Sequence, residues 1–387
     1  MSYGGPILAD GPIPSGRVKN RVVTALQDRV LSTFSWLSAR RLGDQAFARA
    51  ARRLVGGYLY SVKIEVNTAC NLTCPMCYVE RTGAELPRAV VDRVLDDLRG
   101  AGVRVEILGG EPLLRHDLVE IVERAKRGAR SPLVSLYTNG TLVTADRAAR
   151  LRRGGLDVAI VTLVSHRADV HDRFVGRAGA WRETVDGIRA FRDAGVSTYT
   201  FTAVHRANAG DCRAVHAFAT RDLGVGALFF PYVPQRRDDP LTIGREEWHD
   251  VKEWVLYEAS PGHAAFVRDF FMLTGNACSG GNFVLTVKAD GTVQPCPFLD
   301  DLPLGRAGEE SLWSIHRRRF RQAHLREFKA TPGECGGCAY ASVCAGGCRA
   351  GNRELYGTYA RRDHRCLGPY RTPLRRDDVC RRVPCFF

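Results

Sequence analysis

Residues 68–80, "TACNLTCPMCYVE", place Cys70, Cys74 and Cys77 close together, directly after an apolar run. Thiolates are soft ligands that suit zinc or iron–sulfur clusters. A structural zinc site closes with four ligands, and no fourth Cys or His lies nearby in the sequence. The three thiols therefore indicate a zinc site completed by a distant ligand, buried free cysteines, or a four-iron cluster with one iron left open.

Strand-like runs alternate with amphipathic helical stretches from about residue 59. The runs are 59–66, 103–110, 133–139, 156–163, 196–204 and 227–233. This alternation predicts a parallel sheet with right-handed crossovers, and its spacing favours an α/β fold in the form of a partial (β/α)6 barrel. In such folds the chemistry collects in the loops that follow the strands. The cysteine triplet occupies the loop after the first strand, where a site is expected.

The triplet has the spacing C-x3-C-x2-C and resembles the motif of the radical S-adenosylmethionine (SAM) superfamily. The resemblance implies a [4Fe–4S] cluster at Cys70, Cys74 and Cys77, with SAM on the open iron. It also implies reductive cleavage of SAM to a 5′-deoxyadenosyl radical, which takes hydrogen from the substrate. The family usually has an aromatic residue before the third cysteine; here that residue is Met76, and Tyr78 follows the cysteine.

Segments at the ends of the second, third and fourth strands also resemble the SAM-binding regions of the family. In "LGGEP", after the second strand, glycines allow close approach of backbone to a ligand and a carboxylate can accept from an ammonium group. The resemblance assigns the SAM amino group to this segment and the SAM ribose region to the ends of the third and fourth strands. The implied SAM-binding residues are Gly109, Gly110, Glu111, Pro112, Thr138, Asn139 and Thr162.

The later cysteines resemble the SPASM extension of radical SAM enzymes, with C-x9–15-G-x4-C, then C-x2-C-x5-C-x3-C, then a last cysteine. The alternation around Asp290-Gly291 predicts a hairpin that brings Cys296 back toward Cys278. The resemblance implies two auxiliary [4Fe–4S] clusters, the first on Cys278, Cys296 and Cys348 and the second on Cys335, Cys338, Cys344 and Cys366. Two zinc ribbons are the competing interpretation.

The first auxiliary cluster has three assigned ligands and lacks a fourth. The candidates are Cys212, Cys380, Cys385 and the substrate itself.

The pattern along the chain predicts four regions. They are a basic helical extension (1–58, with a helix over 18–55), the barrel (59–275), the SPASM domain (276–370) and a basic tail (371–387). Further helices are expected near 244–259, 261–274 and 309–329.

Composition narrows the class of protein. The chain has 387 residues, 13 cysteines and a net charge of +14. No apolar run approaches the length of a membrane span and we read no signal peptide, so a cytoplasmic location is expected. Clustered cysteines then indicate metal ligands rather than disulfides. The basic termini would suit an anionic partner, but we see no RNA-binding module and do not expect nucleic acid as a partner.

The resemblance implies an oxidoreductase of the SPASM type that modifies a natural-product or cofactor precursor, either a ribosomal peptide or an anionic small molecule. Sugar, nucleoside or haem-type tetrapyrrole chemistry is the first alternative, and a non-catalytic metal-binding scaffold is the second. The expected electron donor is a flavodoxin or a ferredoxin.

Substrate contacts are expected where the sixth strand ends, at Tyr232, Gln235 and Arg236. His171 and Asp172 are interpreted as a helix-start or packing feature, and no general acid or base can be assigned.

Overall fold

A computed structural model of the protein describes Arg21 and residues 58–259, 278, 280–281, 283–344 and 346–372. The predicted helices over 18–55 and 261–274, together with Cys380 and Cys385, lie outside the described residues. The chain divides into two compact units. We call residues 59–232 and 284–315 the barrel unit, and the described parts of 233–283 and 316–372 the cysteine unit. The four predicted domain boundaries stay a prediction.

The barrel unit is built on a nine-stranded sheet in the order β6-β5-β4-β3-β2-β1-β7-β8-β9. Neighbouring strands pair parallel from β6 through β1 to β7, and β8 pairs antiparallel with both β7 and β9. The predicted α/β fold with a partial barrel is confirmed. The strands are β1 (Ser61–Glu65), β2 (Arg104–Leu108), β3 (Val134–Thr138), β4 (Val158–Thr162), β5 (Ser197–Val204), β6 (Gly226–Pro231), β7 (Val284–Val287), β8 (Thr292–Gln294) and β9 (Gly305–Arg306).

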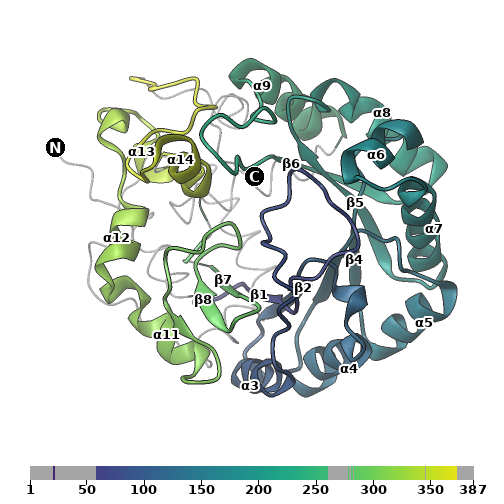
Figure 1. Cartoon of the computed structure of the whole chain (residues 1–387). Helices are drawn as coiled ribbons and strands as arrows, with labels where there is room; N and C mark the ends of the chain where they lie inside the picture. Colours follow the sequence, from purple (N-terminus) through teal and green to yellow (C-terminus); the bar gives the residue numbers. More distant parts are fainter. Residues whose placement is uncertain are drawn as a thin grey trace, which may run out of the picture. The chain divides into compact units, whose positions relative to one another are not determined.

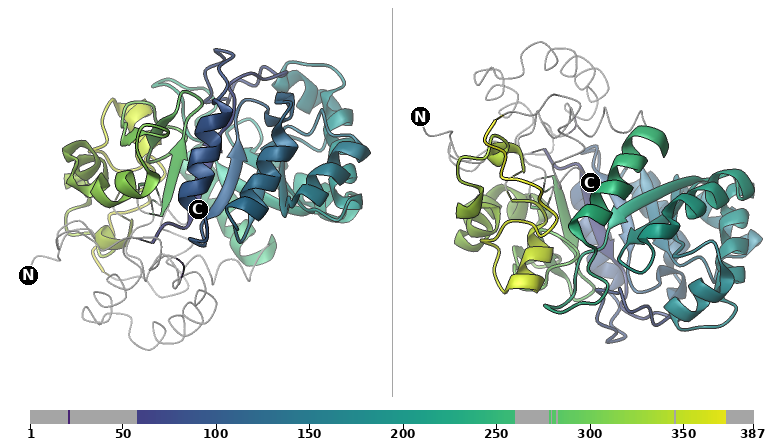
Figure 2. Two further views of the ribbon diagram at one scale, coloured as in Figure 1. Left: turned by 90° about the horizontal axis from the view of Figure 1, so that it is seen from below. Right: turned by 90° about the horizontal axis from the view of Figure 1, so that it is seen from above.

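Helices follow the parallel strands along the outer face of the sheet, as Figure 1 shows and as the two views of Figure 2 repeat. Local chemistry marks their ends. The Thr144 side chain accepts from the Arg147 amide at the start of α5, and Gly155, with φ 104°, ends that helix. The helices are α3 (Arg88–Leu98), α4 (Leu118–Glu123), α5 (Ala145–Gly154), α6 (Ala168–Val175), α7 (Ala180–Asp193) and α8 (Cys212–Ala217).

Alternation along the strands separates a helix-facing core from an inner face. Val62 and Ile64 on β1 are completely buried, whereas Lys63 between them keeps part of its side chain exposed and pairs in register with Glu106 on β2. Side chains two residues apart share a face of a sheet, so the charged residues lie on the face opposite the apolar ones. We call this charged face, with the aromatic residues that continue it, the lumen face.

The predicted hairpin after residue 283 is confirmed. Strands β7 and β8 pair antiparallel, and Gly291 between them has φ 88°, a left-handed conformation that favours glycine. Because β7 also pairs parallel with β1, the hairpin extends the sheet of the barrel unit directly beside β1. That strand leads into the loop of Cys70, Cys74 and Cys77, which we call the first cysteine loop.

The cysteine unit is helical and loop-rich. Its elements are α9 (Arg245–Trp254), the π-turn η5 (Val255–Ala259), the 3-10 turns η6 (Arg319–Arg321) and η7 (Gly333–Cys335), α12 (Ala323–Lys329), α13 (Ala341–Cys344) and α14 (Arg349–Tyr356). The prediction of one helix over 309–329 is wrong. Helix α11 (Leu312–Arg318) gives way to η6, and α12 begins anew after Gln322, whose extended backbone (ψ 126°) breaks the helix.

In the part of the chain that the structure describes, every helix is too short or too polar to cross a membrane.

Candidate cofactor site and lumen

The first cysteine loop lies on a small apolar cluster of its own unit. Leu72, Val164, Val175 and Ala180 are buried together, and Cys70, Cys74, Met76 and Phe174 pack against them. The Thr73 amide donates to the Val175 carbonyl (2.9 Å) at the end of α6. The loop is therefore held by a distant helix as well as by its own sequence.

The "LGGEP" segment holds the same loop from the side of β2. The Gly110 amide donates to the Asn67 carbonyl (2.9 Å), and the Glu111 amide donates to the Ala69 carbonyl (2.7 Å). A Cβ at Gly110 would come within 2.3 Å of the Ala69 oxygen, and one at Gly109 within 2.7 Å of the Asn67 oxygen. Both positions therefore require glycine, because the backbone that leads into Cys70 approaches them too closely for a side chain.

The Glu111 carboxylate joins the ends of β2 and β3. Its Oε1 accepts from the Leu113 amide (3.0 Å) and the Thr138 hydroxyl (2.7 Å), and its Oε2 accepts from the Asn139 amide (2.7 Å). The side chain is fully buried, and burial raises the pKa of Glu111 against the opposing effect of these donors. Its role toward SAM stays a prediction, as do those of Pro112 at its side and Thr162 at the end of β4.

Asn139 reaches back to the cysteine loop. Its Nδ2 lies 2.9 Å from Asn71 Oδ1 and 3.9 Å from Cys70 Sγ. Its Oδ1 accepts from the amide and hydroxyl of Thr141 (2.9 and 2.7 Å), and Asn71 Nδ2 donates to the same hydroxyl (2.9 Å). The structure thus brings together the ends of the first three strands, as the sequence predicted for a common site.

The three thiols of the first loop fit an iron–sulfur cluster. The described cysteines form no disulfide, and Cys70, Cys74 and Cys77 are each half-buried. Burial, then the neighbouring Cys77 and Cys70 thiolates, raises the pKa of Cys74 to about 12. Metal coordination deprotonates thiols and removes this like-charge repulsion, so a cationic iron centre suits the loop.

The lumen face carries an ion pair next to an aromatic wall. Lys63 and Glu106 form a salt bridge, and the Tyr137 hydroxyl donates to Glu106 Oε2 (3.1 Å). The Tyr137 ring meets Phe201 edge-on, with centroids 6.4 Å apart, and Phe201 stacks on Phe230 at 5.5 Å. The row crosses the sheet from β1 to β6.

Sequence reasoning missed this row. Its signal was present in "VKIEV" and "RVEIL", where charged residues alternate with apolar ones within a strand. A charged residue inside a buried strand needs a partner, which predicts a polar cluster on the inner face.

Cys296, assigned to the first auxiliary cluster, follows the β7–β8 hairpin in the barrel unit. Phe298, two residues later, packs edge-on against Tyr78, with ring centroids 4.6 Å apart. Burial raises the pKa of Tyr78, and Cys296 is near enough to add to this shift after Glu65 and Cys77. Although burial opposes it, Glu106 and Tyr137 raise the pKa of Lys63, and Cys296 is near enough to contribute as well. The loop of Cys296 therefore lies beside Cys77 and the lumen face.

The four cysteines assigned to the second auxiliary cluster come together in the cysteine unit. One cavity is lined by Cys335, Cys338, Cys344 and Cys366. Burial raises the pKa of Cys348 to about 11, and Cys278, assigned with it to the first auxiliary cluster, lies near enough in the same unit to add to this shift. Four convergent thiols around a cavity fit an iron–sulfur cluster.

Cys212 lies in α8 of the barrel unit, where it is buried and its thiol approaches the Asn208 carbonyl at 3.6 Å. Its role as a fourth ligand stays a prediction.

The predicted substrate residues fall in different surroundings. Tyr232 is buried and meets His205 edge-on, with ring centroids 6.3 Å apart. Gln235 lies in a bend, and its backbone amide donates to Asp239 Oδ2 (2.9 Å). Arg236 is exposed. Their substrate contacts stay predictions.

The interpretation of Asp172 as a structural residue agrees with its contacts. Its carboxylate accepts from the Gly179 and Trp181 amides (both 2.6 Å) at the start of α7. His171 beside it is buried, and its Nδ1 accepts from the Val164 amide (3.4 Å).

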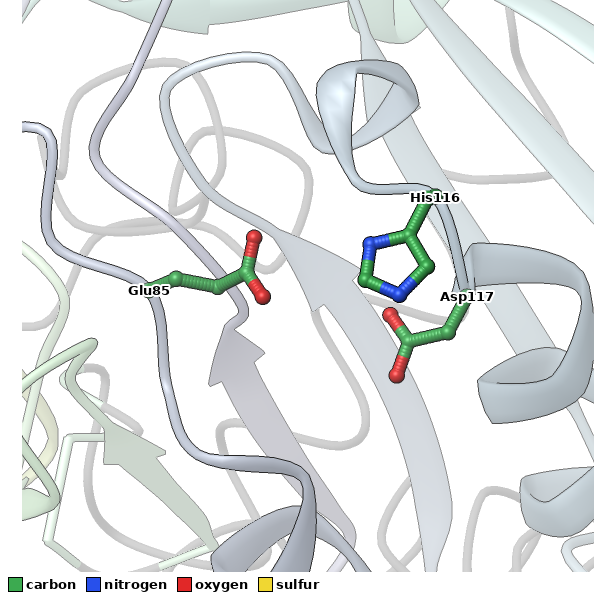
Figure 3. Close-up of side chains that lie close together, drawn as sticks. All are labelled: Glu85, His116 and Asp117. Atoms are coloured by element: carbon green, nitrogen blue, oxygen red, sulfur yellow. The ribbon is translucent and has the colours of Figure 1, made fainter.

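A further group of possible metal ligands lies outside these sites. Figure 3 shows Glu85, His116 and Asp117 converging, with ligand atoms within 4.8 Å of one another. Arginines already pair with both carboxylates: Arg115 lies 3.7 Å from Glu85 Oε1 and 2.5 Å from Asp117 Oδ1, and Arg88 lies 3.2 Å from Asp117 Oδ2. The group is accounted for as a surface ion-pair network.

Comparisons with known proteins agree with this geometry. Residues 64–219 match the model of the radical SAM superfamily, and residues 278–339 match that of the SPASM iron–sulfur cluster-binding domain. The chain is similar to the AdoMet-dependent heme synthase of Methanosarcina barkeri, with 28% identity over 78% of this chain and 95% of the relative. It is also 28% identical to the PqqA peptide cyclase of Gluconobacter oxydans, over 80% of this chain and 91% of that protein.

Among solved structures, Streptococcus suis SuiB bound to S-adenosylmethionine superposes with a TM-score of 0.65. The match has 17% identity and covers 80% of this chain and 77% of SuiB. At this identity the likeness concerns the fold alone.

Proposed function

Because the chain belongs to the radical SAM superfamily and carries a SPASM domain, we propose that it oxidatively modifies a cofactor or natural-product precursor. Its cofactors are SAM, the [4Fe–4S] cluster that binds SAM, and auxiliary iron–sulfur clusters. The chain is thus an oxidoreductase of the radical SAM type, and the non-catalytic scaffold is set aside. The substrate is a ribosomal peptide or an anionic small molecule, and the electron donor is a flavodoxin or a ferredoxin.

The proposed ligands follow from the cysteine motifs. Cys70, Cys74 and Cys77 hold the cluster that binds SAM, and the ends of β2, β3 and β4 hold SAM itself. Cys335, Cys338, Cys344 and Cys366 hold one auxiliary cluster; Cys278, Cys296 and Cys348 hold the other. When bound, these groups supply one electron to cleave SAM and an acceptor for one electron from the substrate.

The lumen face receives the reacting part of the substrate in this proposal. Phe201 and Phe230 offer an apolar wall, and Lys63 with Glu106 and Tyr137 offers polar contacts beside it. Although burial opposes it, Lys63 keeps the pKa of Glu106 below its ordinary value, so the carboxylate stays ionised near neutral pH. An ionised carboxylate in this position can accept a hydrogen bond from the substrate or a proton that the oxidation releases.

One observation supports oxidation in particular. The loop of Cys296, an assigned auxiliary ligand, packs beside Cys77 through the contact of Tyr78 with Phe298 (4.6 Å). An acceptor held by Cys296 would therefore lie next to the lumen face, where the substrate radical forms. Removal of hydrogen at one end of this space and of an electron at the other gives a net two-electron oxidation.

A haem-type precursor is the second candidate for the substrate. The relatives of this chain include AdoMet-dependent heme synthases, and the stacked Phe201 and Phe230 rings (5.5 Å) would suit a flat macrocycle. The PqqA peptide cyclase relatives favour a peptide instead. Incubation with a porphyrin bearing propionate groups, and separately with peptides encoded beside the gene, distinguishes the two by mass change.

Anaerobic reconstitution tests the proposal directly. Three four-iron clusters predict about twelve irons per chain. With dithionite and SAM the reconstituted protein should release 5′-deoxyadenosine, measured by chromatography and mass spectrometry. The triple variant Cys70→Ala, Cys74→Ala, Cys77→Ala should lose this product and about four irons while it keeps the other eight.

Ser197→Ala is the control, because it removes a small polar side chain at an exposed position of the barrel unit outside both motifs. It should keep all the irons and the product. Release of 5′-deoxyadenosine by the triple variant would contradict the proposal, as would a reconstituted chain that binds two or three zinc ions and no iron.

A further inference from the structure

Lys288 directly follows β7 in the barrel unit, and it belongs to none of the cysteine or SAM-binding motifs. The residue is 9% exposed. Its Nζ lies 3.2 Å from Glu65 Oε2 and 3.1 Å from Asp300 Oδ1, and it donates to the Pro297 carbonyl (3.1 Å). The same ammonium group lies 5.5 Å from the centroid of the Tyr78 ring.

The partners of Lys288 belong to two different loops. Pro297 directly follows Cys296, which is assigned to an auxiliary cluster. Tyr78 directly follows Cys77, which is assigned to the cluster that binds SAM. One ammonium group therefore contacts both loops, by a hydrogen bond on one side and a cation–π contact on the other. The Tyr78–Phe298 ring contact lies beside it and joins the same loops.

Glu65 fixes the ammonium group in this place. Its carboxylate is 2% exposed and its Oε1 accepts from the Ala289 amide (3.3 Å), so it holds the backbone next to Lys288 as well as the ammonium itself. Asp300 is mostly exposed, and solvent screens its contribution. A buried lysine with one buried carboxylate is neutral as a pair, so either partner alone would leave a buried charge.

We propose that Lys288 is a positioning residue that fixes the spacing of the two cluster-binding loops. It sets the place of Cys296 relative to Cys77 and puts one positive charge beside both. This inference rests on the proposed function, since it assumes a cluster at each loop. The alternative is an ion pair that only stabilises the pairing of β7 with β1. Loss of such a pair would lower the stability of the fold without changing either cluster.

The two roles are separated by cluster spectroscopy on the full reconstituted chain. Lys288→Met removes one positive charge from beside both loops, and the loss of positive charge makes a cluster harder to reduce. At the wild-type midpoint of each cluster, the ratio of oxidised to reduced form should rise roughly tenfold. The ratio is read by electron paramagnetic resonance during a dithionite titration.

Three further variants complete the test. Lys288→Arg keeps the charge and should restore both midpoints. Lys126→Met is the matched control, because Lys126 forms a similar ion pair with Asp157 (2.7 Å) elsewhere in the barrel unit. Because an unpaired buried carboxylate destabilises a fold, the double variant Lys288→Met with Glu65→Gln removes the whole pair at nearly constant volume. It should change the line shapes of both clusters.

The outcomes separate the inference from the function on which it rests. A wild-type chain that binds no iron refutes the proposed function whatever Lys288 does. A wild-type chain with about twelve irons, whose midpoints and line shapes are unchanged in Lys288→Met and in the double variant, refutes the positioning role alone. Equal shifts in the Lys126→Met control would also overturn it.

Discussion

Asp363 is the carboxylate that orders the cysteine-rich segment, and its loss should release the auxiliary clusters. Its Oδ1 accepts from the Arg365 amide (2.9 Å) and Nε (3.0 Å). Its Oδ2 accepts from Arg365 Nη2 and from the Cys348 amide (both 2.8 Å). The Asp363 backbone adds two bonds, from its amide to the Gly346 carbonyl and from the Cys366 amide to its carbonyl (both 3.0 Å). One residue thus connects cysteines assigned to both auxiliary clusters.

The size of the effect of Asp363→Asn follows from these contacts. Although burial opposes it, the Arg365 guanidinium holds the pKa of Asp363 well below its usual range, so the carboxylate is charged at neutral pH. The amide of asparagine keeps one accepting oxygen and turns a donor toward Nη2 and the Cys348 amide. Two charge-assisted hydrogen bonds are lost, at about 1.5–3 kcal/mol each. Removal of one partner of a buried ion pair costs a similar 3–5 kcal/mol, so we expect about 4 kcal/mol.

Iron release under native conditions measures this loss. A destabilisation of about 4 kcal/mol raises the population of the opened cysteine unit roughly a thousandfold. When opening limits chelation, the auxiliary irons of Asp363→Asn should pass to a chelator up to roughly a thousand times faster than those of the wild type. The four irons assigned to the first cysteine loop would lie in the barrel unit, so their release and the formation of 5′-deoxyadenosine should change little.

Glu246→Gln is the matched control, because it makes the same change of carboxylate to amide at an exposed position of the cysteine unit. Its irons should leave at the wild-type rate. If Asp363→Asn loses auxiliary iron less than about tenfold faster than the wild type, its contribution is below about 1.4 kcal/mol and the reasoning from buried, charge-assisted bonds is wrong.

Three further outcomes test the barrel unit. Asp172→Ala removes the acceptor of the Gly179 and Trp181 amides and should cost about 1–2 kcal/mol, seen as faster hydrogen exchange at the start of α7. Burial lowers the pKa of His171 to about 4, so the unfolded chain binds a proton first as the pH falls below 6.5. His171 should make the protein about 1 kcal/mol less stable at pH 5.5 than at pH 7.5, by thermal unfolding, and His171→Leu should reduce the pH dependence by that amount while the buried His364, whose pKa is also lowered, still contributes. In Glu111→Gln the side-chain NH2 group would face one of the backbone amides, of Leu113 or Asn139, that donate to the carboxylate. This change should weaken SAM binding roughly tenfold, as measured by anaerobic calorimetry.

Much of the fold follows from local patterns. The alternation of strand and helix predicts the parallel order of β1 to β6, and Asp290-Gly291 predicts the β7–β8 hairpin, because each depends on residues near one another in the chain. The cysteine spacing likewise identifies the first loop, whose place after β1 follows from the rule for parallel sheets. The break between α11 and α12 was missed, because no proline or glycine marks Gln322.

The contacts within the site depend on register and were beyond local reasoning. Lys63 meets Glu106 only because β1 and β2 pair in that register. Lys288 meets Glu65 because β7 adds to the edge of β1, more than two hundred residues away along the chain. A sequence pattern can show that a charge lies inside a strand, but the partner that compensates it is decided by the tertiary fold.

The first cysteine loop shows how a local motif depends on distant residues. Its spacing of thiols is a property of a short sequence, but its shape is set by the Gly110 amide, the end of α6 and the Asn139 side chain. A cluster that must keep one iron open for SAM needs ligands that stay in place when SAM binds and leaves, since a mobile side chain would otherwise occupy the open position. A chain with the same three cysteines but without these supports should assemble iron and still hold SAM poorly, so we expect "LGGEP" and the end of β3 to belong to the cofactor site as much as the thiols do.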